Sequence, residues 1–383
     1  MKINFGEASA DDLGMEMEME MEIEELKAVK VVGKGAMGTV FLIQKRGFDR
    51  PLALKAMSKS VLEKQKDGLK RARVEKEILS SLRHPFLPTL FGQVDTEKIV
   101  GWVVDYCSGG DLNGLRRRQP EKIFSENVIR FYAAEIILAL EHLHSVGIVY
   151  RDLKPENVLV QEDGHIMLTD FDLSAVLRPP TEPPQSPKRP GKFAFMTSCV
   201  TSSVSRVSPV NKKPPNTKTN SLVGTEEYVS PEMLEGGGHD FPVDWWAFGV
   251  LLYELSSGKT PFTGATRKDT FYNVLVRQPP FSGRWTPLRD LIQRLLIKDP
   301  KRRLGFNGVE EIKSHFFFRG LDWESIEMLV NVTAPPFVPS PVCMDDVAAM
   351  QRIDVERHLL YREDSKNEMS QSEGNQTDVF SGF

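Results

Sequence analysis

The sequence predicts an α+β protein of two lobes, with a β-rich N-terminal lobe followed by an α-rich C-terminal lobe. Three short runs of apolar and β-branched residues succeed one another between residues 26 and 57, as expected for neighbouring strands of a sheet. Beyond Asp105 the apolar residues recur every three or four positions instead, which is the period of a helix buried on one face. A cleft between two such lobes is a natural ligand site.

Composition places the chain among ordinary globular proteins. Of its 383 residues, 40% are hydrophobic and 27% are charged, which allows a sizeable core. The formal net charge of −4 argues against a dedicated nucleic-acid binder. The three cysteines are few and far apart, as in reduced intracellular proteins, and no apolar run reaches the roughly 18 residues of a membrane span. We therefore expect the protein in the cytoplasm, the nucleus or both. We also expect a monomer.

The N-terminal lobe is expected over residues 26–104. Residues 1–25 precede it with an alternating Met/Glu run whose like charges repel in any compact state, so we expect disorder or a marginal helix there. Strands are expected in LKAVKVVG, GTVFLIQ and PLALKAM, and a charged helix is expected in DGLKRARVEKEILSSLR.

A glycine-rich motif, GKGAMGTV, lies between the first two strands and contains Gly33, Gly35 and Gly38. The same spacing occurs in dinucleotide-binding folds, but there the loop opens a helix, whereas residues 39–44 have the pattern of a strand. The motif therefore predicts a strand–loop–strand hairpin whose backbone amides lie over phosphates. An ordinary glycine-rich hairpin is the alternative.

Two charged residues complement this loop. Lys55 ends the apolar strand LALK and can extend its ammonium group towards a pair of phosphates. Glu75, on the following helix, can fix Lys55 by an ion pair. Taken singly, each residue has the pattern of an ordinary surface charge.

The C-terminal lobe is expected over residues 105–325, with helices in ENVIRFYAAEIILALEHLHSVG, VDWWAFGVLLYELSSG and LRDLIQRLLIKD. Residues 178–220 interrupt it with a Pro-, Ser- and Lys-rich insert that is too long for an ordinary loop, so we expect disorder there. Contact with anionic membrane lipid, a nuclear signal, partner docking and a simple solvated loop all remain open for this insert. Residues 326–383 are expected to form a polar tail, with a flexible coil after Pro341.

The most specific motif is YRDLKPENVLV, which matches a catalytic-loop pattern. Asp152 is placed to accept the proton of a substrate hydroxyl, and Lys154 to neutralise charge on a moving phosphoryl group. Asn157 offers a neutral oxygen to a metal ion whose other ligand is Asp170, in the string LTDFDLS.

From about Leu26 to Trp323, these motifs resemble those of the protein kinase family and follow the family's order. YRDLKPEN, SLVGTEEY and DYCSGGDL are similar to the AGC group, while D-F-D in place of D-F-G and the basic insert resemble the plant-specific class VIII of that group. FYAAEIILAL, VGTEEYVSPE, GHDFPVDWWAFG and a terminal F-x-x-F resemble the Oxidative Signal-Inducible kinases most, with UNICORN a less close relative.

The resemblance implies a bilobal protein-kinase fold and transfer of phosphate from ATP, with Mg²⁺, to serine or threonine of protein substrates. It also implies that Asp244 anchors the catalytic loop and that Arg303 is the buried partner of Glu232. The residues expected to bind ATP are Gly33, Gly35, Gly38, Val40, Ala53, Lys55, Val104, Asp105, Cys107 and Asp111.

The departure from D-F-G falls at Asp172. Glycine supplies backbone freedom there, and aspartate is among the few residues that tolerate left-handed conformations. We therefore expect Asp172 to replace glycine through local backbone hydrogen bonds, with metal ligation as the alternative.

Substrate choice and activation are also implied by the resemblance. Asp111, Glu156 and Glu254 are expected to form acidic subsites for arginines upstream of the acceptor residue, or else to be surface charges. Thr225, on the acceptor side of the site, is expected to favour serine or threonine over tyrosine as the acceptor residue. Ser221 is the expected activating phosphosite, with Arg151 as the partner of its phosphate.

The last two aromatic residues, Phe380 and Phe383, are expected to dock into a hydrophobic groove of the phosphoinositide-dependent kinase. Two other functions compete with an active kinase. D-F-D is compatible with a nucleotide-binding pseudokinase that acts as a scaffold, and the glycine loop alone with an NAD-dependent enzyme. Phosphate transfer from labelled ATP to a basic peptide discriminates among these three.

Overall fold

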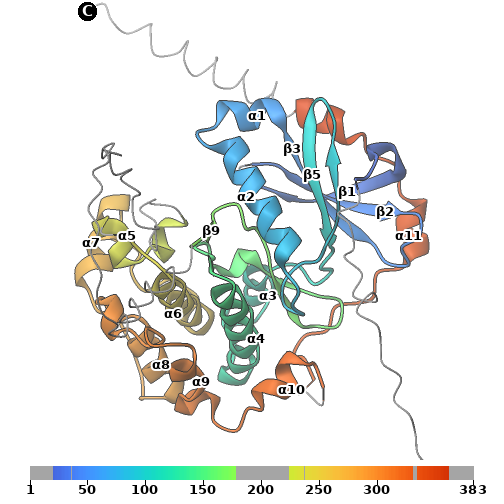
Figure 1. The fold of residues 1–383 in the computed structure, drawn as a ribbon. Helices are drawn as coiled ribbons and strands as arrows, with labels where there is room; N and C mark the ends of the chain where they lie inside the picture. The colour runs from blue at the N-terminus through green and yellow to red at the C-terminus, as the bar shows by residue number, and fades with distance from the viewer. Residues whose placement is uncertain (1–19, 36, 178–223, 237, 331–333, 362–383) are drawn as a thin grey trace, which may run out of the picture.

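The computed structural model describes residues 20–35, 37–177, 224–236, 238–330 and 334–361. These form the two predicted lobes, with a sheet-containing lobe above a helical lobe (Figure 1). The strands are β1 (Leu26–Lys34), β2 (Thr39–Lys45), β3 (Leu52–Ser58), β4 (Leu90–Asp95), β5 (Ile99–Asp105), β6 (Ile148–Val149), β7 (Val158–Val160), β8 (Ile166–Leu168) and β9 (Ala175–Val176). The α-helices are α1 (Lys59–Lys64), α2 (Gly68–Ser81), α3 (Leu112–Arg117), α4 (Glu126–Ser145), α5 (Pro231–Glu235), α6 (Pro242–Ser257), α7 (Arg267–Val276), α8 (Pro287–Leu295), α9 (Glu310–Lys313), α10 (Trp323–Glu327) and α11 (Met344–Ala349). The 3-10 helices are η1 (Ile23–Glu25), η2 (Pro155–Asn157), η3 (Glu226–Tyr228), η4 (Pro300–Arg302) and η5 (Phe316–Phe318).

The N-terminal lobe is built on one five-stranded sheet in the order β1-β2-β3-β5-β4, in which every neighbouring pair is antiparallel. The three predicted strands are confirmed as β1, β2 and β3. The predicted charged helix is α2, which Figure 1 shows beside the sheet on the side that faces the helical lobe. Its buried residues include Ala72, Ile78 and Leu79, spaced as one face of a helix.

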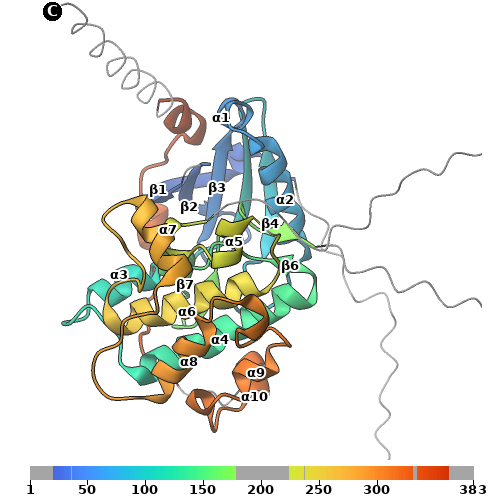
Figure 2. The ribbon, with the colours of Figure 1, turned by 90° about the vertical axis from the view of Figure 1, so that its left-hand side faces the viewer.

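The helical lobe is organised around α6, which runs through its middle with α4 and α8 packed against it (Figure 2). Because α6 carries apolar residues on all sides, it is buried nearly throughout. All three helices were predicted from their periodicity. In the part of the chain that the structure describes, no helix combines the length and the apolarity that crossing a bilayer requires.

The C-terminal segment 334–361 packs on both lobes, so the prediction of flexible coil after Pro341 is wrong as far as residue 361. Val347 of α11 is buried against Val29 and Leu42 on the outer face of the sheet (Figure 1). The backbone N–H of Ile353 then donates to the carbonyl of Ala28 at 2.7 Å. These contacts join residues that are far apart in the sequence, so no pattern of neighbouring residues could predict them.

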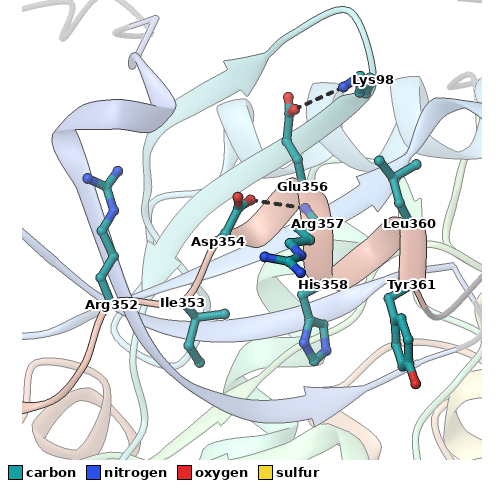
Figure 3. Close-up of a pocket in the computed structure, with 9 residues that line it drawn as sticks. All are labelled: Lys98, Arg352, Ile353, Asp354, Glu356, Arg357, His358, Leu360 and Tyr361. Carbon is teal, nitrogen blue, oxygen red and sulfur yellow. Dashed lines mark hydrogen bonds and ion pairs between the residues drawn. The ribbon is translucent and has the colours of Figure 1, made fainter.

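A helix at 355–361 ends this segment and lies on the N-terminal lobe. Figure 3 shows Glu356 directed at Lys98, 3.8 Å away, beside a shallow cavity of about 730 Å³ that lies outside the catalytic region. Residue Met21 is buried in the same lobe and pairs with the backbone of Gln93 at 2.8 Å. The prediction of disorder is therefore wrong for residues 20–25, whereas the short 3-10 helix η1 fits the alternative of a marginal helix. Residues 1–19 lie outside the described ranges.

Candidate active site

The glycine-rich motif forms the hairpin between β1 and β2. Gly33 lies opposite Val40 in the antiparallel register, and the N–H of Gly35 donates to the carbonyl of Gly38 at 2.9 Å. A Cβ atom at Gly38 would lie 2.4 Å from the carbonyl oxygen of Ala56, so only glycine fits there. A strand rather than a helix follows the loop, which confirms the predicted hairpin and removes the dinucleotide alternative.

The apolar residues expected to contact a nucleotide lie side by side in the sheet register. Val40 pairs with Lys55 between β2 and β3, and Ala53 pairs with Val104 between β3 and β5. The adjacency follows from strand pairing alone. Gly33 adds to this set from β1, so these residues form one patch that ends at the Lys55 side chain.

Asp105 and Cys107 have side chains that are engaged elsewhere. The Asp105 carboxylate accepts the N–H of Thr89 at 2.8 Å and pairs with Arg50 at 3.0 Å. The Cys107 thiol is buried against Met167, and burial raises its pKa to about 12. Asp105 and Cys107 can therefore contact a nucleotide through their main-chain groups.

Lys55 is held between two carboxylates. Its Nζ lies 2.6 Å from Glu75 Oε1 and 2.7 Å from Asp170 Oδ1, while Glu75 Oε2 accepts the indole N–H of Trp102 at 3.3 Å. Burial opposes the charged form, but Glu75 and Asp170 together raise the pKa of Lys55 above its ordinary value. The ammonium is therefore permanently charged and fixed at the edge of the nucleotide patch.

The β7–β8 ribbon brings the two predicted metal ligands together. Val158 pairs with Leu168, so Asn157 and Asp170 project from the same end of the ribbon, and the N–H of Thr169 donates to the carbonyl of Asn157 at 3.0 Å. Burial would raise the pKa of Asp170, but Lys55 lowers it below the usual range. The Asp170 side chain is 42% exposed, which leaves its second oxygen accessible.

A divalent cation fits this donor set. Mg²⁺ takes hard oxygen ligands, often only one or two carboxylates with phosphates and water completing its shell. The Asn157 amide nitrogen donates to Asp152 Oδ2 at 2.8 Å, which leaves the amide oxygen as a neutral ligand. Among the described residues no group of three or more His, Cys, Asp or Glu side chains is placed to hold a metal ion.

Asp152 lies in a nearly buried cluster with its predicted neighbours. Its Oδ2 accepts from Lys154 Nζ at 2.7 Å, and its Oδ1 accepts from the Thr225 hydroxyl at 3.3 Å. Lys154 also donates to that hydroxyl at 3.0 Å. A carboxylate and an ammonium thus meet at a hydroxyl position, and this arrangement can take a proton and balance negative charge at one point.

The catalytic loop is anchored from beneath by Asp244, as predicted. Its carboxylate is fully buried and accepts the backbone N–H groups of Tyr150 at 2.9 Å and Arg151 at 2.7 Å. The predicted pair of Glu232 and Arg303 is also confirmed, with two nitrogen–oxygen contacts of 2.6 and 2.8 Å. Asp244 thus holds the catalytic loop, while the Glu232–Arg303 pair ties α5 to the segment that follows α8.

Asp172 differs from its prediction in two ways. The residue with a left-handed backbone is Asp170, with φ of 63°, rather than Asp172. The Asp172 carboxylate pairs with Arg71 of α2 instead of with local backbone groups. Burial and the neighbouring Asp170 raise the pKa of Asp172 to about 6, and Arg71 opposes that rise. Sequence reasoning missed Arg71, although its position four residues before Glu75 was a usable signal.

Of the three acids expected to face substrate arginines, Glu254 is already paired. Its carboxylate accepts from Tyr228 at 2.6 Å and from Arg116 at 3.0 Å. Arg116 is buried, although arginine is usually exposed, and it reaches Glu156 through Asn113. Besides Glu254, its guanidinium donates to the main-chain carbonyls of Lys122 at 2.8 Å and Gly258 at 3.4 Å, whereas the two arginines that follow it are exposed.

Asp111 and Glu156 retain accessible carboxylates. Asp111 caps α3 by accepting the N–H of Gly114 at 2.7 Å through one oxygen. Glu156 is exposed and accepts from Asn113 at 2.7 Å, also through one oxygen. Each acid therefore keeps a second oxygen for a cation. Ser221, Phe380 and Phe383 lie outside the described residues.

Comparison with known proteins agrees with this geometry. A profile of the protein kinase domain matches residues 26–318. Serine/threonine-protein kinase OXI1 of Arabidopsis thaliana is 47% identical over 340 residues, which cover 82% of this chain and 79% of OXI1. Serine/threonine-protein kinase UCN of the same plant is 46% identical over 347 residues, covering 83% of this chain and 84% of UCN. Serine/threonine-protein kinase AGC1-5, also from this plant, is 41% identical over 362 residues.

Proposed function

Because the chain belongs to the protein kinase family and is a serine/threonine kinase of the plant AGC type, we propose that it transfers the γ-phosphate of Mg-ATP to substrates with basic residues upstream of the acceptor. The observation that carries this proposal is that Asp152 and Lys154 meet at one hydroxyl, that of Thr225, and at each other. No catalytic group of the family pattern is missing, which disfavours a pseudokinase.

The residues divide the transfer among them. The substrate hydroxyl oxygen bonds to the γ-phosphorus while the bond to the leaving oxygen of ADP breaks, and the hydroxyl proton passes to Asp152. Lys154 balances the charge that gathers on the transferred group, and Lys55 holds the phosphates. Asn157 and Asp170 would hold the metal, whose chemistry is to neutralise phosphate charge.

Basic-context specificity is supported by Asp111 and Glu156, because each keeps one carboxylate oxygen for a guanidinium group. Glu254 contributes less than the sequence suggests, since Arg116 already neutralises it. We therefore place the preference for upstream arginine on the first two acids.

The test is transfer of labelled γ-phosphate from ATP to a peptide library by the purified full chain, with Asp152→Asn as the control. We expect labelling on serine and threonine, enrichment of peptides with upstream arginine, and loss of both with Asp152→Asn. ATP binding without any transfer would establish the pseudokinase instead. Transfer without a basic preference would remove the proposed specificity and leave the kinase activity.

Activation is proposed to require phosphorylation of Ser221 by the phosphoinositide-dependent kinase, captured through Phe380 and Phe383. Arg151, whose Nε donates to the carbonyl of Leu173 at 2.6 Å, supports this role because it links the catalytic loop to the segment that leads to Ser221. The variant Ser221→Ala should be folded and nearly inactive, and Phe380→Ala/Phe383→Ala should weaken capture. Full activity of unphosphorylated Ser221→Ala, or equal capture of the double variant, would exclude the respective step.

We also propose a cytoplasmic or nuclear location, with membrane contact through the basic insert, within signalling that includes oxidative stress.

A further inference from the structure

A second ion pair joins α2 to the turn at 170–172, beside the Lys55–Glu75 pair. The Arg71 guanidinium contacts Asp172 twice, with Nε donating to the main-chain carbonyl at 3.2 Å and a terminal nitrogen pairing with carboxylate Oδ2. The Asp172 side chain is only 10% exposed, and that of Arg71 is 32% exposed. Solvent therefore screens this pair less than an ion pair on the open surface.

The position of Arg71 on α2 allows this contact to fix the orientation of the helix. Arg71 and Glu75 are one helical turn apart and lie on the same face of α2. Glu75 reaches the turn through Lys55, which contacts Asp170 at 2.7 Å, whereas Arg71 reaches it directly. If only Glu75 contacted the turn, α2 could pivot about that contact. Two contacts one helical turn apart fix the orientation of α2 as well as its distance from the turn.

The carboxylate at position 172 supplies what glycine would not. With glycine, the Arg71 guanidinium would lose the carboxylate and keep the main-chain carbonyl of residue 172 as its partner in the turn. A carboxylate adds a charge-assisted hydrogen bond to it. The charged groups around this carboxylate are Arg71, Lys55, Asp170 and Glu75, so Arg71 is the cation in direct contact with it.

We propose that Asp172 and Arg71 are a positioning pair, in which the aspartate of D-F-D holds α2 in the orientation that lets Glu75 fix Lys55 against the phosphates. Neither residue touches the reacting atoms in this role, and the proposal rests on the kinase activity proposed above. It predicts that the two side chains act as one unit, so that removing the second after the first costs little more.

The test is a double-mutant cycle in the full chain, with Arg71→Met, Asp172→Asn and the double variant, at matched Ser221 phosphorylation checked by intact mass. Each single variant should lower kcat about tenfold, and the double variant no further, with KM for ATP changed less than about twofold. Arg73→Met is the matched control, because Arg73 is an exposed arginine of the same helix, and it should retain full kcat. Asp172→Glu, which restores the charge, should exceed Asp172→Asn.

Three outcomes would overturn the pair. Additive losses of about a hundredfold in the double variant would mean independent roles. Full activity of Asp172→Asn would mean that the carboxylate is dispensable. A raised Mg²⁺ requirement in Asp172→Asn, absent from Arg71→Met, would identify Asp172 as a metal ligand.

Hydrogen exchange of the α2 amides gives a readout that does not depend on turnover. Exchange should accelerate in Arg71→Met and Asp172→Asn but not in Arg73→Met, because only the first two release the helix. Unchanged exchange in all three variants would contradict the proposal. If the wild-type chain transfers no phosphate, the proposed function fails while this measurement still decides the pair.

Discussion

The catalytic loop and the turn at 170–172 each contain a residue other than glycine in the left-handed region, yet they are held in different ways. Arg151 has φ of 67° and Asp170 has φ of 63°, and such backbone costs about 1–3 kcal/mol at each position. The loop is fixed by Asp244, which is fully buried in the helical lobe. The turn is fixed by Lys55 and Arg71, which come from the other lobe and are partly exposed.

The difference separates the tasks of the two regions. The proton acceptor Asp152 belongs to a region assembled within one lobe. The metal ligand Asp170 belongs to a region whose geometry depends on the position of α2 relative to the helical lobe. Loss of lobe alignment should therefore impair metal and phosphate handling before it disturbs the proton acceptor.

The largest effect should come from the proton acceptor itself. Asp152→Asn removes the charge that receives the hydroxyl proton and pairs with Lys154, so kcat should fall about 10³-fold. Labelled phosphate transfer measures the loss, with Asp345→Asn, an exposed aspartate of α11, as the control. A loss below tenfold would show that another group accepts the proton.

The anchor of the catalytic loop should give the next effect. Asp244→Asn leaves buried N–H groups of Tyr150 and Arg151 with a weaker acceptor, so the free energy of unfolding should fall by about 2–3 kcal/mol. Denaturant titration measures this change. Stability equal to that of wild type would mean that the loop is held by other contacts and would weaken the contrast between the two regions.

The elements that could be predicted are those that depend on residues close together in the sequence. The first three strands follow from short apolar and β-branched runs, α2 from a charged run, and α4, α6 and α8 from hydrophobic periodicity. The catalytic cluster follows from motif spacing. The Arg116–Glu254 pair and the packing of the tail could not be predicted in this way, because these partners lie over 100 residues apart in the sequence. The Arg71 contact is intermediate, since helix spacing placed it near Glu75 but nothing local indicated Asp172.

Arg116 allows the substrate side of the helical lobe to be tested. Arg116→Leu removes the cation that neutralises Glu254, so the preference for an upstream arginine, expressed as a ratio of kcat/KM values, should rise about tenfold. Arg117→Leu changes an exposed neighbour on the same helix and should leave the ratio unchanged. An unchanged ratio in both variants would mean that Glu254 does not face the substrate.

The smallest effects should come from the tail on the N-terminal lobe. Val347→Ala removes a buried apolar contact with the sheet and should lower the free energy of unfolding by about 1–2 kcal/mol. Lys98→Ala breaks a partly exposed pair with Glu356 and should change the free energy of unfolding by less than about 0.5 kcal/mol. The reverse order in thermal or denaturant unfolding would show that charge, rather than apolar packing, holds the tail.

The division of labour between Asp152 and Asp170 is tested most directly by the effect of Mg²⁺ on ATP binding, measured by calorimetry on wild type, Asp152→Asn and Asp170→Asn. Mg²⁺ should tighten ATP binding equally in wild type and Asp152→Asn, because the proton acceptor does not hold the metal. The tightening should be largely lost in Asp170→Asn, since the charged oxygen ligand is gone. An equal effect of Mg²⁺ on all three proteins would contradict the assignment of Asp170 as the metal ligand.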